Sequence, residues 1–290
     1  MTKVTKDILK ELYPARPPEV KKYDYGLMLV IGGGDFYTGS PALVSLAGFR
    51  AGVDMVRLIA PKRAADIIAS FTPVLAAFPL EGPRLTQSHL ASLISLTEGA
   101  KDVSHGKVSV VIGGGMGRSQ ETQDAIVEYL SNVNVPVVID ADAIHAVAGK
   151  PDVLKGKPFV ITPNTYELQL LGARDLRQLG DEERVKEVMS AAANLGTTLL
   201  ANLAKAKVDI ISNGTDVLLN EAGSPYLSVG GAGDTMAGIA GALLARGVSP
   251  LQAAAGAAYI NGKAGELAAK KFGESLIATD IIDFISDAIQ

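Results

Sequence analysis

The stretch VGGAGDTMAG, at positions 229–238, joins a glycine-rich turn to a helical pattern. Apolar residues recur at helical spacing from Met236 to Leu244, and Gly247 follows, so we expect a helix over 235–246. The N-terminus of such a helix offers free N–H groups and the positive end of the helix dipole. Glycines let a phosphate approach the backbone closely. The stretch therefore predicts an anion site, with Asp234 beside the group that is transferred.

Asp234 has two interpretations. Aspartate is a favoured helix cap, and an isolated Gly-Asp pair before a helix is typical of capping alone. The glycine-rich run that precedes Asp234 favours a catalytic base instead. On this interpretation we expect the helix dipole to keep the carboxylate ionised at neutral pH.

Composition sets the class of protein. The chain has 290 residues, 48% of them hydrophobic, a net charge of −4 and no cysteine, which is enough apolar material for one large α/β domain. Lys and Arg are scattered, so no nucleic acid partner is expected. The N-terminus has no signal-peptide core, and no apolar run is long enough to cross a membrane. We therefore expect a cytoplasmic protein without a histidine-based metal site, because its three histidines are far apart in sequence.

Short apolar runs alternate with helical patterns along the chain. This order predicts a mostly parallel central sheet with helices on both faces. We expect strands at 27–31, 55–60, 74–78, 108–112, 135–139, 159–161, 197–201, 208–212 and 217–220. We expect helices at 41–51, 62–70, 87–96, 120–130, 167–171, 182–195, 235–246, 250–271 and 279–289.

Several polar or glycine-rich segments follow predicted strands, and therefore belong to the edge where open α/β sheets bind ligands. Glycine runs at 32–34 and 113–115 are either tight turns or places where a ligand approaches closely, and we favour the ligand. Neither run completes the GxGxxG dinucleotide pattern, because Tyr37 and Arg118 stand at the third glycine position.

The charged residues at this edge leave alternatives open. Asp140 and Asp142 either hold Mg²⁺, accept ribose hydroxyls or cap the next helix. Glu167 either orients a hydrated Mg²⁺ or begins a helix, so the metal site stays undetermined. Lys205 and Lys207 either bind phosphate or lie on a solvated edge.

Beyond these residues, the segment GGAGD (230–234) resembles the GxGD signature of ribokinase-like small-molecule kinases. The order of further motifs resembles one branch of that superfamily, the ADP- or ATP-dependent NAD(P)H-hydrate dehydratases. The matching segments are GG (32–33), YTGSP (37–41), RAGV (50–53), GGGMG (113–117), DADA (140–143), TPNTYE (162–167), KAKVD (205–209), NGKAG (261–265) and ATD (278–280).

The resemblance implies a ribokinase-like three-layer domain over residues 26–290, preceded by an N-terminal extension, 1–25, that is too short for the epimerase domain of bifunctional relatives. It implies phosphorylation of the ring hydroxyl of NAD(P)H hydrate by ADP or ATP with Mg²⁺, followed by loss of phosphate and recovery of NAD(P)H. A homo-oligomer such as a tetramer is the implied assembly. The implied site residues are Asp234 for catalysis; Ser40, Gly117, Asn164 and Asp234 for the substrate; and Lys205, Ala206, Lys207, Val208, Asp209, Gly231 and Gly233 for the nucleotide.

Some positions depart from the family pattern. Ser40 replaces alanine, Asn164 replaces a histidine used at the substrate, and Asp209 stands where threonine is usual. Two rival functions therefore remain: a kinase of the same fold acting on a vitamin-like alcohol, and a nucleotide sensor without catalysis. The preference for ADP or ATP, and for NADH or NADPH hydrate, stays open.

Overall fold

The computed structural model describes residues 1–202 and 208–290. Their strands form one sheet, in the order β1-β10-β9-β8-β7-β6-β5-β2-β3-β4. Only β9 runs against its neighbours among the pairings recorded for these residues, so the predicted mostly parallel sheet is confirmed. The strands are β1 (Thr2–Lys3), β2 (Leu27–Ile31), β3 (Met55–Pro61), β4 (Ala76–Leu80), β5 (Val108–Ile112), β6 (Val137–Ile139), β7 (Phe159–Ile161), β8 (Thr198–Ala201), β9 (Asp209–Ser212) and β10 (Val217–Asn220).

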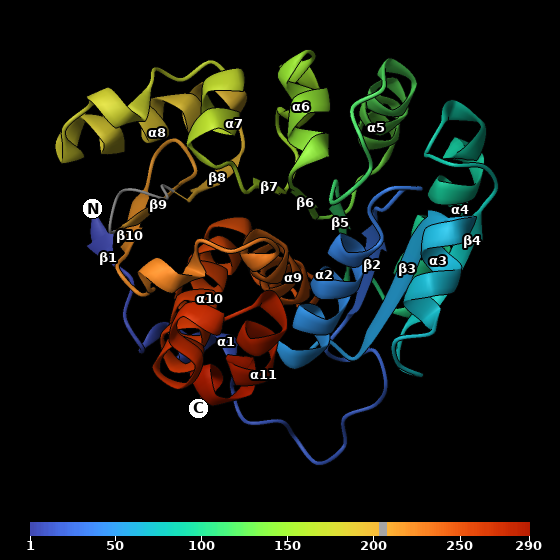
Figure 1. Ribbon diagram of the computed structural model, residues 1–290, viewed down its shortest axis with the longest axis horizontal. Helices are drawn as coiled ribbons and strands as arrows, with labels where there is room; N and C mark the ends of the chain where they lie inside the picture. Colours follow the sequence, from blue (N-terminus) through green and yellow to red (C-terminus); the bar gives the residue numbers. More distant parts are fainter. Residues whose placement is uncertain (203–207) are drawn as a thin grey trace.

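Helices cover both faces of the sheet (Figure 1). The α-helices are α1 (Ile8–Leu12), α2 (Gly39–Arg50), α3 (Lys62–Ala69), α4 (Leu90–Val103), α5 (Gln120–Asn132), α6 (Asp142–Ala148), α7 (Thr165–Leu170), α8 (Asp181–Leu195), α9 (Ala232–Ala245), α10 (Pro250–Phe272) and α11 (Ala278–Ile289). Short 3₁₀ helices are η1 (Gln87–His89), η2 (Pro151–Leu154), η3 (Leu176–Gln178), η4 (Pro225–Leu227) and η5 (Gly273–Ser275). Figure 1 shows α4 to α8 above the sheet and α2, α9, α10 and α11 below it.

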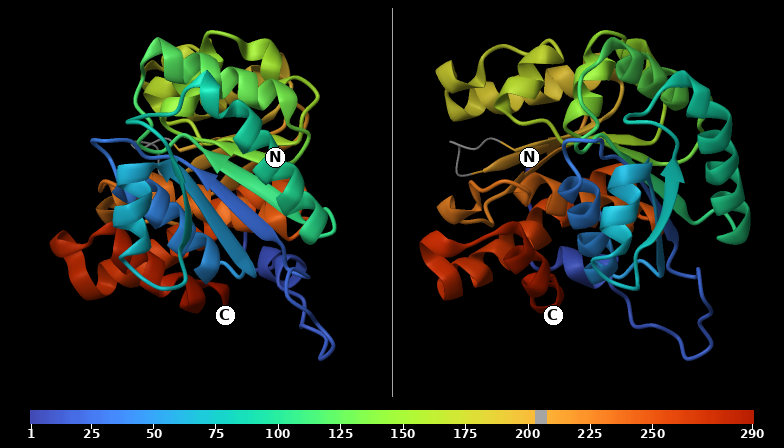
Figure 2. Two further views of the ribbon diagram at one scale, coloured as in Figure 1. Left: turned by 90° about the vertical axis from the view of Figure 1, so that its right-hand side faces the viewer. Right: turned by 45° about the vertical axis from the view of Figure 1, so that its right-hand side comes forward.

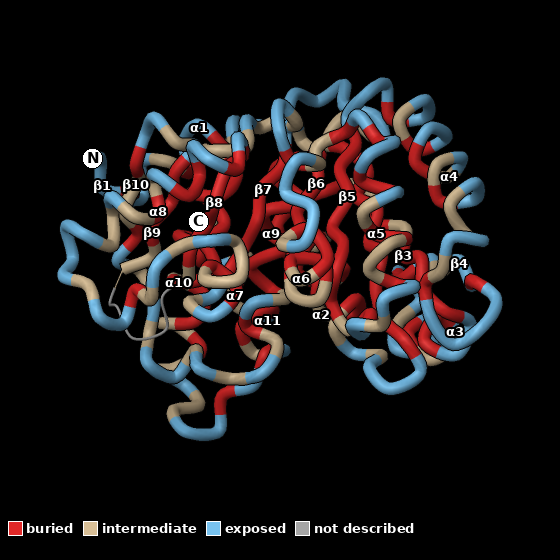
Figure 3. Tube along the Cα trace, turned by 90° about the horizontal axis from the view of Figure 1, so that it is seen from above, coloured by how far each residue is buried: buried red, intermediate tan, exposed pale blue. Residues whose placement is uncertain are grey.

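Strand β2 explains why two layers of helices are needed. Leu27, Leu29 and Ile31 pack into the core under α4 to α8, whereas Met28 and Val30 pack into the core against α2, α9 and α10. All five residues are buried, and the central strands β5, β6 and β7 are drawn as buried in the interior of the molecule in Figure 3. A strand that is apolar on both faces requires cover on both faces, which is the physical basis of this fold.

The N-terminal segment joins the domain rather than standing apart from it. Strand β1 pairs in parallel with β10 at one edge of the sheet, and Leu9 and Leu12 of α1 are buried in the same core as α9 and α10. A loop between α1 and β2 extends outward, as Figure 2 shows in blue. Among the described residues, no helix is both long and apolar enough to span a membrane.

Candidate active site

The site begins with the turn that leads into α9. Gly231 has a φ of +93°, a conformation that glycine adopts without strain, and the helix starts at Ala232. Helix α9 therefore begins three residues before the predicted start at Thr235, and Asp234 lies inside its first turn. Within the described part of the chain, the N–H groups of Gly231, Gly233 and Asp234 donate to no protein acceptor. Gly230 and Gly233 are exposed, so this helix start presents free donors to an anion.

Asp234 is held from a distant part of the sequence. The Ser40 hydroxyl, in the first turn of α2, donates a hydrogen bond of 2.6 Å to Asp234 Oδ1. Burial raises the pKa of Asp234 above its ordinary value, and the Ser40 hydrogen bond acts in the opposite direction. Desolvation is thus the larger influence on this pKa, and ionisation of Asp234 at neutral pH remains a prediction.

A second carboxyl lies beside Asp234. Asp140 follows β6, is buried, and accepts a 2.6 Å hydrogen bond from the Thr162 hydroxyl at the end of β7. Burial, reinforced by the charge of Asp234, raises the pKa of Asp140 to about 7. The next residue, Ala141, has a φ of +48°, which is costly for a residue with a side chain. Two carboxyls in one low-dielectric site cannot both ionise easily, so they form a coupled pair.

Asp142 has different hydrogen-bond partners from Asp140. Its carboxylate accepts hydrogen bonds of 2.8 Å from the Gly117 N–H and from Arg118 Nε. Asp142 therefore fixes the loop after β5, which includes the predicted substrate residue Gly117. No capping hydrogen bond from either aspartate side chain to the start of α6 is present among the described residues.

The two glycine runs pack against each other. The Gly33 N–H donates to the Gly114 carbonyl at 2.8 Å, and a Cβ on Gly32 would lie 2.7 Å from that same oxygen. A Cβ on Gly113 would overlap the Asp140 carbonyl. Close approach of neighbouring loops therefore accounts for glycine at these positions, and the close ligand approach that we favoured from the sequence remains a prediction.

Asn164 and Glu167 form a capping box at the start of α7. Asn164 Oδ1 accepts from the Tyr166 and Glu167 N–H groups, and Glu167 Oε2 accepts from the Asn164 N–H at 2.9 Å. Glu167 is buried, and this burial raises its pKa. Both side chains therefore have structural partners; their expected roles toward the substrate and a hydrated Mg²⁺ remain predictions.

The predicted nucleotide segment is described only at its end. Lys205, Ala206 and Lys207 lie outside the described residues, and Val208 is half-buried. Asp209 begins β9 and accepts a 2.9 Å hydrogen bond from Asn220 Nδ2 on β10. Burial raises the pKa of Asp209 to about 6. Asp209 is thus paired within the sheet, which leaves its contact with a nucleotide a prediction.

The donor groups around α9 fit phosphate better than a bare metal ion. Across residues 1–202 and 208–290, no group of three or more His, Cys, Asp or Glu side chains is arranged to hold a metal. The free N–H groups at the start of α9 instead suit anionic oxygens. A Mg²⁺ ion would therefore be held here mainly through the phosphates of a nucleotide.

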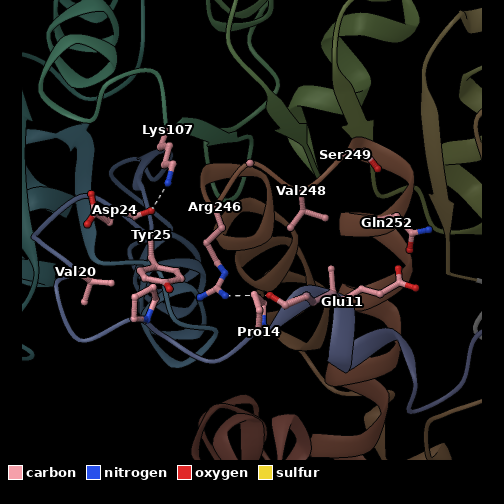
Figure 4. Close-up of a pocket in the computed structure, with 13 residues that line it drawn as sticks. Glu11, Pro14, Val20, Asp24, Tyr25, Lys107, Arg246, Val248, Ser249 and Gln252 are labelled. Atoms are coloured by element: carbon pink, nitrogen blue, oxygen red, sulfur yellow. Dashed lines mark hydrogen bonds between the residues drawn. The ribbon is translucent and has the colours of Figure 1, made fainter.

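A separate cavity lies away from this site. It has a volume of about 570 Å³ and lies where β2 and β5 begin, between the N-terminal segment and the turn after α9. Figure 4 shows Tyr25, Lys107, Arg246 and Gln252 around it. Since β2 and β5 lead away from this cavity toward their glycine runs, it lies at the opposite edge of the sheet from Asp234.

A comparison with protein families decides where the chain belongs. The sequence profile of the NAD(P)H-hydrate dehydratase family matches residues 28–287. The chain belongs to the NAD(P)H-hydrate dehydratase family. The resemblance drawn from the ordered motifs is thereby confirmed.

Two relatives illustrate the match to this dehydratase family member. The bifunctional NAD(P)H-hydrate repair enzyme Nnr of Pyrobaculum aerophilum is 39% identical over 278 residues, which cover 95% of this chain and 52% of that protein. The ADP-dependent (S)-NAD(P)H-hydrate dehydratase of Cenarchaeum symbiosum is 32% identical over 290 residues, covering 99% of this chain and 96% of that protein. The chain thus spans about half the length of the bifunctional relatives.

Solved structures agree on the fold. A ribokinase-like superfamily protein from Enterococcus faecalis matches with a TM-score of 0.83 and 23% identity, covering 100% of this chain and 95% of that one. The ADP/ATP-dependent NAD(P)H-hydrate dehydratase from Bacillus subtilis, co-crystallized with ATP/Mg²⁺, matches with a TM-score of 0.76 and 22% identity, covering 99% and 97%. The predicted ribokinase-like fold is confirmed.

One pair of site residues in this dehydratase family member escaped the sequence analysis. The buried Thr235 hydroxyl donates to Asn261 Oδ1 of α10 at 2.6 Å, and Asn261 Nδ2 donates to the Ala232 carbonyl at 3.3 Å. This pair ties the first turn of α9 to α10. The available signal was the NGKAG segment at 261–265, which resembles a family motif but carries no pattern that indicates a structural contact.

Proposed function

We propose that this chain catalyses the nucleotide-dependent dehydration of NADH or NADPH hydrate and so returns the coenzyme to its active form. The observation that carries the proposal is a carboxylate, Asp234, set inside a helix start whose N–H groups are free. A relative that matches over 96% of its own length is named an ADP-dependent (S)-NAD(P)H-hydrate dehydratase, which supports the same activity here.

The proposed reaction has two stages. Asp234 accepts the proton of the ring hydroxyl while that oxygen attacks the terminal phosphorus of ADP or ATP. The N–H groups of Gly231 and Gly233 stabilise the charge on the moving phosphoryl group. The electron pair of the ring nitrogen then expels phosphate, and loss of a proton from the adjacent ring carbon restores the double bond of NADH or NADPH.

The remaining residues are assigned to binding. We assign Gly117 and Asn164 to substrate binding, Ser40 to the surroundings of Asp234 that face the substrate, and residues 205–209 to nucleotide binding. Bound Mg²⁺ would neutralise charge on the nucleotide phosphates, which is the electrostatic help that phosphoryl transfer needs. A cytoplasmic homo-oligomer, with a tetramer as its expected form, completes the proposal and can be measured by light scattering.

One assay separates this function from its rivals. Purified protein is mixed with NADH hydrate, Mg²⁺ and either ADP or ATP, and NADH absorbance and released phosphate are followed together. We expect both to rise in equal amounts. A vitamin-type kinase would consume nucleotide with its own alcohol but produce no NADH from the hydrate, and that outcome would refute the proposal.

A thermal melt tests the nucleotide site independently of turnover. Ligand at about 100 times its dissociation constant adds roughly 2.7 kcal/mol to the free energy of unfolding. We therefore expect Mg²⁺ with ADP or ATP to raise the melting temperature by several degrees. Stabilisation without turnover would indicate a sensor, whereas no stabilisation by either nucleotide would remove the enzymatic proposal.

A further inference from the structure

Ser40 occupies an unusual place in this site. It lies in the first turn of α2, is half-buried, and is 194 positions away from Asp234 in sequence. Its hydroxyl donates to Asp234 Oδ1 at 2.6 Å, a short distance typical of a hydrogen bond to a charged acceptor. The side chain expected to contact the substrate is therefore already engaged with the proposed base.

The surroundings of Asp234 distinguish its two oxygens. A Cβ placed on Gly114 would lie 3.1 Å from Oδ1 and 3.1 Å from Ser40 Oγ, so Oδ1 faces the loop after β5. A Cβ placed on Gly231 would lie 3.9 Å from Oδ2, so this oxygen faces the turn that starts α9. Among the described residues a protein donor is recorded for Oδ1 and none for Oδ2, so Oδ2 is the oxygen left to accept a proton.

The geometry points to Ser40 as a positioning residue for the base: it holds Oδ1 so that Oδ2 receives the proton of the substrate hydroxyl. This inference rests on the proposed function and names a role within that site. Because the Asp234 carboxylate is already held in one orientation, its side chain loses less conformational freedom when the transition state forms. Ser40 therefore acts on turnover through Asp234, without itself contacting the reacting atoms.

Ser40 also affects the ionisation of the base. A donor to the charged form of a carboxyl lowers its pKa, and Ser40 lowers that of Asp234 against the effect of burial. Asp140, after β6, is the ionisable neighbour coupled to Asp234 by charge, and Glu167 acts on Asp140 in turn. From α2 the group that contacts Asp234 is the neutral Ser40 hydroxyl, and from α10 the neutral Asn261 contacts the adjacent Thr235.

The test compares Ser40→Ala with Ser45→Ala. Ser45 lies in the same helix and its buried hydroxyl donates to the Pro41 carbonyl at 2.7 Å, so its variant controls for loss of a serine hydrogen bond in α2. For Ser40→Ala we expect kcat to fall about tenfold, the loss associated with one hydrogen bond to a charged group. KM should change less than about twofold, and the acid limb of kcat/KM should move up by about half to one pH unit. Ser45→Ala should keep the wild-type pH profile.

A direct titration keeps the inference separate from the proposed activity. The Asp234 carboxyl is followed by ¹³C NMR, with its signal assigned through Asp234→Asn. We expect its pKa to be higher in Ser40→Ala than in wild type, whether or not NADH is produced. An unchanged pKa, or a variant with raised KM and unchanged kcat, would overturn the positioning role and indicate substrate contact instead; a wild type without dehydratase activity would count against the proposed function alone.

Discussion

Helix α9 has a charged side chain near each end: Asp234 lies in its first turn, and Arg246 lies just past its last turn. The two side chains differ in the protein partners that surround them. The Arg246 guanidinium donates to the Gly52 carbonyl at 3.1 Å and the Leu12 carbonyl at 3.0 Å. It also lies 4.7 Å from the Tyr13 ring centroid and 4.8 Å from that of Tyr25. At this end the protein supplies acceptors for both terminal nitrogens of the guanidinium, while its buried Nε has no partner among the described residues. Two backbone acceptors and two aromatic rings are the pattern of a structural residue.

The opposite end leaves hydrogen-bonding capacity unused. Asp234 has one protein donor, Ser40, and the adjacent N–H groups of Gly231 and Gly233 have no acceptor among the described residues. Unused donors beside a carboxyl with a raised pKa are typical of a site completed by a ligand. The comparison therefore supports the proposal of chemistry at the N-terminal end of α9, with structural support at its C-terminal end, roughly 20 Å away.

The largest effect is expected from a substitution that removes the carboxylate at the N-terminal end of α9. Asp234→Asn keeps an oxygen for the Ser40 hydroxyl but cannot accept the substrate proton. We expect turnover to fall by roughly 10²–10⁴-fold, while the melting temperature and nucleotide affinity change little. Initial rates of NADH formation and a thermal melt measure both. Asp66→Asn, on the exposed face of α3, controls for loss of an aspartate charge; near-normal turnover in Asp234→Asn would show that another residue takes the proton.

The second prediction concerns a substitution that removes the side-chain contacts at the C-terminal end of α9. Arg246→Ala leaves the Gly52 and Leu12 carbonyls without their donor and removes the guanidinium from two tyrosine rings. We expect the free energy of unfolding to fall by about 2–4 kcal/mol, with kcat within about twofold of wild type at temperatures where the variant is folded. Urea unfolding and the NADH assay measure these quantities. The exposed Arg50→Ala should change neither, and a larger loss of kcat than of stability in Arg246→Ala would contradict the comparison.

The third prediction concerns Asp140, the second buried carboxyl beside the N-terminal end of α9. The pKa of Asp140 is about 7 when folded, against about 3.9 when unfolded. Between these values the folded protein binds more protons, so this group lowers stability as pH rises from about 4 to 7. Asp140→Asn cannot ionise and loses this dependence. Between pH 5.5 and 7, the free energy of unfolding, measured with urea, should fall by up to roughly 2 kcal/mol more in wild type than in Asp140→Asn. Parallel pH curves for the two proteins would mean that Asp140 is ionised throughout this range.

The sequence predicts the frame of the fold because its signals are local. A strand such as Leu27–Ile31 is apolar at every position and needs no partner to be recognised. Asn213-Gly214 likewise marks the turn between β9 and β10 by its own backbone preference. The two-residue strand β1 and helix α6 were not predicted, because β1 is too short for a pattern and α6 follows Ala141 in a conformation that alanine rarely adopts.

The site was predicted less completely because its properties depend on distant contacts. The glycine-rich turn and Asp234 could be located from sequence, whereas the early start of α9 depends on Asn261, which binds the Ala232 carbonyl. The raised pKa of Asp234 depends on burial that the sequence around it does not reveal. The pairing of Ser40 with Asp234 joins segments that only the folded sheet brings together.

The smallest effect is expected from the substitution of a single glycine at the N-terminal end of α9. Gly233→Val tests whether the first turn of α9 is open for a ligand. Gly233 has no positive φ, and a Cβ there would meet no atom within 4 Å. Folding should therefore tolerate valine, and only a phosphate that approaches the backbone would be obstructed. We expect nucleotide affinity to fall about tenfold, which corresponds to about 1.4 kcal/mol, with a melting temperature close to that of wild type.

Gly99 provides the matched control for Gly233. It lies within α4, is exposed, and a Cβ there would also meet nothing within 4 Å. Gly99→Val therefore makes the same substitution in a helix where no anion site is proposed. Nucleotide affinity, measured by calorimetry with Mg²⁺, should fall in Gly233→Val and stay at the wild-type value in Gly99→Val. Equal affinity in both variants would mean that the free N–H groups at the start of α9 bind water rather than phosphate, and the contrast between the two ends of the helix would then carry no functional meaning.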